Sequence, residues 1–327
     1  MLKRLLQGCR EVVSDSLKVI TTLFKIMIPA ILVVKLLTEL GATEWLGQLL
    51  TPIMGWMGLP PEAGLIWATS LLTNIYTGVV IFFSTQGTAD WTLAQVTVLG
   101  VLLLSAHNLP VEIRVAQKAG CRVLPQLLLR IGGGILLGTI LHHGYRLSDS
   151  LQTTQELPWQ PQPAGGGWLE WGLSQLQTLF WTALMILLLM TSLRLLRLLG
   201  IERLIEWALR PLLKLIGIAP NALSITLIGM TLGLAYGGGL LIREAEKGDI
   251  EPADVFCAIS LLGLCHSLIE DTLLVLVMGA DLSGILWARL AFALITIAII
   301  SRLLPRLPQQ HWLYRSVHSP RTEPASH

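Results

Sequence analysis

Two segments of similar pattern, SAHNLPVE at residues 105–112 and CHSLIEDT at residues 265–272, decide how this chain is organised. Each places a histidine five positions before an acidic residue: His107 before Glu112, and His266 before Asp271. The histidines are 159 positions apart (266 − 107), and so are the acidic residues (271 − 112). A constant offset of this kind is the mark of an internal repeat.

The same offset holds without a gap from residue 35 to residue 130. Matched pairs are Gly41 and Gly200, Pro52 and Pro211, Gly58 and Gly217, Pro61 and Pro220, Asp90 and Asp249, Gly120 and Gly279, and Arg130 and Arg289. Because a leucine-rich composition alone does not keep glycines, prolines and charges in register, we predict two homologous repeats, at residues 1–147 and 168–304. The polar residues 148–167 predict a linker, and residues 305–327 a disordered tail.

The composition requires lipid as the solvent for most of the chain. Of the 327 residues, 53% are hydrophobic and 13% are charged, which is too little polar surface for a water-soluble globule of this size. Several stretches, including residues 176–193, 259–277 and 282–300, are or lie within apolar runs of about 20 residues, enough to cross a bilayer as a helix. We expect an all-α polytopic membrane protein whose main partner is the lipid bilayer, with no nucleic-acid partner.

Each half shows the same order of expected elements. A long apolar helix, at residues 19–40 or 176–199, leads to a shorter amphipathic segment, at 45–57 or 201–216, which is typical of an interfacial helix. Two apolar stretches follow, each interrupted by small or polar residues. A last span contains Arg130 or Arg289.

The positive charges limit the number of crossings. If all four long segments of each half crossed, the basic residues of 114–122 and 194–214 would lie opposite the basic N-terminus. If one interrupted segment per half is a re-entrant hairpin, both clusters lie on the N-terminal, cytoplasmic side, with both chain ends. Three crossings per half make the two repeats inverted. Either interrupted segment could form the hairpin.

Polar and ionisable groups in the apolar segments are the candidates for function, because such groups are costly in lipid and usually face a cavity or a partner. We predict a substrate site near mid-bilayer, where the repeats meet. Its candidate residues are His107, Asn108, Glu112, His266, Ser267, Glu270, Asp271, Asn74, Tyr76, Tyr236 and Gly237. Four of these, His107, Glu112, His266 and Asp271, suit a divalent metal as substrate or ligand. Protons could couple there as well, because histidine titrates near neutral pH.

A structural role for the same residues stays open at this point. Each histidine could donate to a backbone carbonyl, and the acidic residues could neutralise Arg130 and Arg289 as buried ion pairs. The glycines of residues 237–239 could serve close helix packing.

The duplicated unit resembles the nucleoside-recognition, or Gate, domain over about residues 19–304. The resemblance is carried by residues 76–78 and 236–239 and by the two quoted histidine segments. That domain occurs in bacterial membrane proteins, in spore-maturation proteins, in ferrous-iron transporters and in concentrative nucleoside transporters. It implies a bacterial inner-membrane protein with inverted Gate repeats and a transport-like core. The chain departs from the iron transporters by lacking a GTPase module, and from the nucleoside transporters by lacking recognisable sodium and nucleoside motifs.

We therefore expect a secondary transporter or channel-like carrier for a small polar solute or ion, and not an enzyme. A divalent metal or a proton-coupled substrate is favoured. The alternatives are a nucleoside transporter, a membrane metallohydrolase using the four histidine and acidic residues, and a non-transporting assembly or signalling subunit. A homo-oligomer also stays open.

Overall fold

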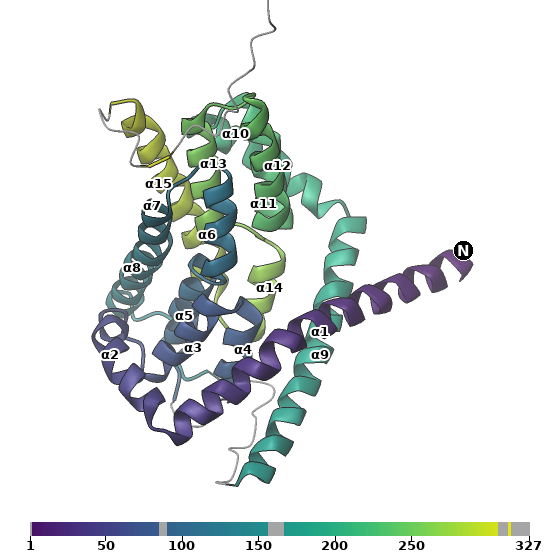
Figure 1. The fold of residues 1–327 in the computed structure, drawn as a ribbon, viewed down its shortest axis with the longest axis vertical. Coiled ribbons are helices and arrows are strands. Elements are labelled where there is room, and N and C mark those ends of the chain that lie inside the picture. The colour runs from purple at the N-terminus through teal and green to yellow at the C-terminus, as the bar shows by residue number, and fades with distance from the viewer. Residues whose placement is uncertain (1, 85–89, 156–166, 307–312, 315–327) are drawn as a thin grey trace, which may run out of the picture.

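A bundle of helices makes up the protein, as Figure 1 shows for the computed structural model, which describes residues 2–84, 90–155, 167–306 and 313–314. Within these residues there is no β-strand beyond two isolated bridges. Five helical spans in this part of the chain are long and apolar enough to cross a membrane. The expected all-α membrane fold is confirmed.

The helices of the two halves follow one another in the same order. The first half contains α1 (Leu2–Glu39), α2 (Ala42–Trp56), α3 (Glu62–Leu72), α4 (Ile75–Ser84), α5 (Leu93–Ser105), α6 (Leu109–Lys118), α7 (Val123–Leu127), the π-helix η1 (Leu128–Gly132) and α8 (Gly133–Leu147). The second contains α9 (Trp168–Leu198), α10 (Ile201–Leu215), α11 (Pro220–Leu232), α12 (Leu234–Lys247), α13 (Pro252–Leu264), α14 (Glu270–Val277), the π-helix η2 (Ser283–Ala288), α15 (Arg289–Leu303) and the turn η3 (Leu304–Arg306). Both ends of α2 and α10, and of α5 and α13, differ by 159 positions (201 − 42 and 252 − 93).

The matched glycines explain part of this correspondence. Gly41 and Gly200, which end the long first helix of each half, have φ of 71° and 73°. These values lie in the left-handed region that glycine adopts without steric cost. The chain therefore turns in the same way at the same place in both repeats.

The first interrupted segment of each half forms the hairpin. Helices α3 and α4 pack on each other, as do α11 and α12, and each pair stays within one half of the molecule in Figure 1. The second interrupted segment instead continues through its break, from α5 into α6 and from α13 into α14 (Figure 1). Each half therefore has a hairpin, a broken helix and two long unbroken helical segments.

The two repeats are inverted. Helix α2 lies at the lower end of the molecule in Figure 1 and its counterpart α10 at the upper end. In the same view α6 lies above α5, whereas α14 lies below α13. The broken helices thus run past each other in opposite senses.

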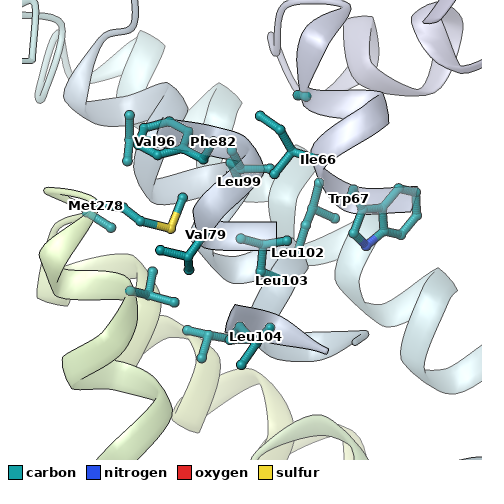
Figure 2. Packing of buried hydrophobic residues seen from close by; sticks show 14 of the residues in the cluster. Ile66, Trp67, Val79, Phe82, Val96, Leu99, Leu102, Leu103, Leu104 and Met278 are labelled. Carbon is teal, nitrogen blue, oxygen red and sulfur yellow. The ribbon is translucent and has the colours of Figure 1, made fainter. Parts of the chain in front are cut away.

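Each broken helix ends in the core of the other repeat. Figure 2 shows Met278, which follows α14, beside Val79, Val96 and Leu99 of the first half. In the same way Ala116 and Ala119, at the end of α6, belong to a core formed mostly by the second half. This interlocking holds the centres of the two broken helices together.

The predicted linker and tail lie partly outside the described residues, at 156–166, 307–312 and 315–327. Within the described part, Thr154 bridges to Thr92, and the Arg122 backbone N–H donates to the Leu313 carbonyl at 2.9 Å. The boundaries assigned to the repeats, the linker and the tail stay a prediction.

Candidate functional site

The site begins with the breaks in the two spanning helices. Asn108 and Ser267 have φ of 48° and 47° and lie 159 positions apart (267 − 108). In the first half Pro110 opens α6, where a missing N–H costs no intrahelical bond. The free backbone donors are satisfied by the hairpins: the Asn108 N–H donates to the Ser70 carbonyl at 2.9 Å, and the Leu268 N–H to the Met230 carbonyl at 2.8 Å.

Two buried arginines bind the carbonyls that the breaks leave free. Arg130 donates from Nε to the Ser105 carbonyl at 3.1 Å and from Nη2 to the His107 carbonyl at 3.2 Å. Arg289 repeats this arrangement with the carbonyls of Leu264 and His266, both at 3.0 Å. The positive charge of each arginine also offsets the partial negative charge at the C-terminus of the preceding helix. The structure supports the scaffold role for both arginines.

The two histidines present the same ring nitrogen to the centre of the protein. His107 Nδ1 lies 2.7 Å from the Leu103 carbonyl, and His266 Nδ1 lies 2.7 Å from the Leu262 carbonyl. Because a carbonyl only accepts, each Nδ1 carries the proton, so that Nε2 of the neutral ring has a free lone pair. The ring centroids are 5.2 Å apart and both residues are buried. The structural alternative, in which each histidine donates to a backbone carbonyl, therefore accounts for Nδ1 only and not for Nε2.

Glu112 joins the histidines to an arginine. Its Oε1 lies 3.2 Å from His107 Nε2 and 3.6 Å from His266 Nε2, and its Oε2 lies 2.5 Å from Arg130 Nη1. The predicted buried ion pair thus forms in the first half. Part of the charge on Glu112 is neutralised within the protein.

Asp271 occupies the equivalent position but makes no such pair. Its Oδ2 lies 3.8 Å from His266 Nε2 and 4.0 Å from His107 Nε2. Within the described part of the chain, no ion pair joins Asp271 to Arg289, although both residues are buried. Neither Asp271 Oδ2 nor Arg289 Nη1 makes a hydrogen bond there, and the same is true of Glu112 Oε2 and Arg130 Nη1, which are joined by their ion pair alone. An unpaired buried carboxylate oxygen is costly unless something binds it.

The donor atoms have the spacing of a metal site. One ligand atom each from His107, His266 and Asp271 lies within 4.8 Å of the other two. In a tetrahedral zinc site with bonds of about 2.1 Å, ligand atoms lie about 3.4 Å apart. The distances from Asp271 Oδ2 to the two imidazoles exceed that spacing by a few tenths of an ångström. The chemistry and the spacing of these groups both fit a divalent cation.

A cavity of about 230 Å³ opens beside these groups. Of the other predicted residues, Asn74, Tyr76, Asn108, Tyr236 and Ser267 line it. The Nδ2 of Asn74 is buried and has no hydrogen-bond partner in the described residues. Gly237 does not line the cavity: a side chain there would overlap the backbone of Gly229 on α11. For Gly237 this close approach favours the helix-packing interpretation, and its role in binding stays a prediction.

A larger cavity of about 820 Å³ lies between α1 of the first half and helices α9, α11, α12 and α14 of the second. Glu270 lines this outer cavity, and Leu232 and Tyr236 line both cavities. The Tyr76 hydroxyl donates to Glu270 Oε1 at 2.8 Å, which joins the two repeats at the boundary between the cavities. The outer cavity could not be predicted, because its charged lining comes from segments expected to face lipid or water: Asp15, Arg194, Arg197 and Glu202.

Comparison with known proteins identifies the relatives of this chain. A family model described as nucleoside recognition, named Gate, matches residues 20–117. A protein of Bacillus subtilis (strain 168), titled uncharacterized membrane protein YvoD, is 32% identical over 292 residues, which cover 85% of this chain and 89% of the relative. No solved structure matches the chain significantly.

Proposed function

Since the chain belongs to the family of Gate-domain membrane proteins that includes YvoD, we propose that it is a secondary transporter or channel-like carrier, not an enzyme, whose central site binds a divalent cation. The observation that carries this proposal is the meeting of two imidazole Nε2 atoms and an unpaired Asp271 oxygen inside the protein. Nitrogen and carboxylate ligands together suit zinc, manganese and ferrous iron.

The charge balance of the site supports a cation. Arg130 is paired with Glu112, and both neutral histidines would turn lone pairs toward carboxylate oxygens. Lone pairs facing one another repel, so the arrangement needs either a proton on Nε2 or a cation among the donor atoms. A site that can exchange protons for a metal ion is suited to coupled transport.

The architecture also supports a transport function. Broken helices and hairpins that meet near mid-bilayer in inverted repeats are the arrangement in which secondary transporters hold their substrates. The outer cavity lies on the side of α10, whose end of the molecule carries the basic clusters. We infer from the positive charges that this side and both chain ends are cytoplasmic, in a bacterial inner membrane.

The proposal is tested by uptake into proteoliposomes that contain a metal-sensitive dye, with Zn²⁺, Mn²⁺, Fe²⁺ and Co²⁺ supplied outside. We expect uptake of at least one of these ions by the wild type and none by His107→Ala/His266→Ala. Metal analysis of both purified proteins should show a bound ion in the wild type only. Absence of uptake and of bound metal in a folded wild type would overturn the proposal.

A nucleoside is the second candidate substrate. It is favoured by the description of the matching family model and by the unpartnered Asn74 amide in the central cavity. Asn108 lines the same cavity and could add a hydrogen bond to a base or ribose. Labelled uridine and adenosine therefore belong in the same uptake assay. Nucleoside uptake that survives the double histidine substitution would favour this candidate over the cation.

A further inference from the structure

Helix α10 presents three different faces. Leu209 and Leu213 are buried against the protein, and Leu204 and Leu215 form an exposed apolar face. The third face is exposed and carries Arg203, Trp207, Arg210 and Lys214. Their spacing of four, three and four residues places these side chains on one side of an α-helix. Such a helix can lie in a membrane surface with its basic side toward the headgroups.

Among the described residues, the basic face has no partner. In the described part of the chain, no hydrogen bond or ion pair involves Arg203, Arg210 or Lys214. The nearby Glu202 is paired with Arg197 at 3.1 Å, and Glu206 lies at the border with the buried face. The positive charge of this face is thus available to an anion outside the protein.

The basic face occurs on only one of the two matched helices, α10, and is therefore not a feature shared by both repeats. At an offset of 159, the equivalent positions of α2 hold Glu44, Gln48, Thr51 and Gly55, none of which is basic. Figure 1 places α2 and α10 at opposite ends of the molecule. The two interfacial helices have therefore diverged toward surfaces of different charge.

We propose that the face formed by Arg203, Trp207, Arg210 and Lys214 binds the headgroups of anionic phospholipids. Basic residues beside a membrane attract anionic lipids, and a tryptophan ring is suited to the level of the headgroups. Two arginines and a lysine one turn apart can bind phosphate from one side. This inference rests on α10 alone and does not depend on what the protein transports.

The test is native mass spectrometry of the detergent-purified full chain with phosphatidylglycerol or phosphatidylethanolamine added. We expect the wild type to retain phosphatidylglycerol preferentially. Arg203→Gln/Arg210→Gln/Lys214→Gln should weaken this binding on the order of fivefold per charge removed. Excess inorganic phosphate should displace little lipid, because the occupant is a headgroup anchored by its acyl chains.

Two matched variants separate charge from folding. Arg203→Lys/Arg210→Lys keeps the charge and should retain phosphatidylglycerol as the wild type does. Arg146→Gln removes an exposed charge at the end of α8 and should change nothing. Equal retention of phosphatidylglycerol by the wild type and the triple variant, or equal binding of both lipids to the wild type, would overturn the assignment.

Discussion

Replacing Asp271 with glutamate should stabilise the protein and weaken its cation site. At the equivalent position of the first repeat, Glu112 Oε2 reaches Arg130 Nη1 at 2.5 Å. Asp271 is one methylene shorter and, in the described residues, forms no ion pair with Arg289 and no hydrogen bond through Oδ2. A glutamate side chain extends about 1.5 Å further and can adopt the position that Glu112 shows.

The size of both effects follows from these two buried groups. Pairing this buried carboxylate with the buried guanidinium should add about 1–3 kcal/mol to the free energy of unfolding. This corresponds to a rise in melting temperature of roughly 2–6 °C. The carboxylate that pairs with Arg289 is then a weaker ligand, although the net charge of the site is unchanged. Loss of that ligand should raise the Kd for a divalent cation by about tenfold or more.

The assay combines thermal unfolding in detergent without metal with a Co²⁺ absorbance titration, for the wild type and Asp271→Glu. The mirror variant Glu112→Asp serves as the control, since it should leave Arg130 unpaired and lower the melting temperature by a similar amount. If Asp271→Glu binds Co²⁺ as tightly as the wild type and melts at the same temperature, the unpaired Asp271 oxygen is not the ligand that we infer.

Two further predictions concern the path to the site and the packing of the second hairpin. Tyr76→Phe removes the hydrogen bond to Glu270 between the two cavities. Co²⁺ should then associate and dissociate several-fold faster, as measured by stopped-flow absorbance, at an unchanged Kd. Unaltered rates would show that this hydrogen bond is no barrier to the ion. Gly237→Ala places a methyl group against the Gly229 backbone and should lower the melting temperature, whereas Gly239→Ala meets open space and should leave it equal or higher. Equal melting of the two glycine variants would contradict the packing role.

Much of the fold could be predicted because the repeat preserves residues with strict backbone requirements. Gly41 and Gly200 match in sequence, and both end a long helix with a positive φ. The positive-inside rule then required an odd number of crossings per half, which implies inversion. Local backbone conformation and the distribution of charge were therefore enough to predict the topology, because neither depends on knowing the tertiary contacts.

The choice of hairpin could not be predicted in the same way. Both interrupted segments of each half are apolar, of similar length and broken by small or polar residues. What distinguishes them is where the chain goes after the break, and this depends on contacts between elements: the Ser70 carbonyl of the hairpin binds the Asn108 N–H of the broken helix. Gly237 shows a related difficulty, since a glycine that lines a cavity and one that faces another glycine look alike in sequence.

The matched positions fall into two groups with different roles. Arg130 and Arg289 are identical because each binds the carbonyls of the break in its own repeat, and both copies of the fold need this. Glu112 and Asp271 differ, and so do Val111 and Glu270, at positions that face the shared centre or the other repeat. At a centre shared by two repeats, one carboxylate (Glu112) can form a structural ion pair while the other (Asp271) forms none. We propose that the difference of a single methylene between Glu112 and Asp271 separates a structural ion pair from a carboxylate that binds a ligand.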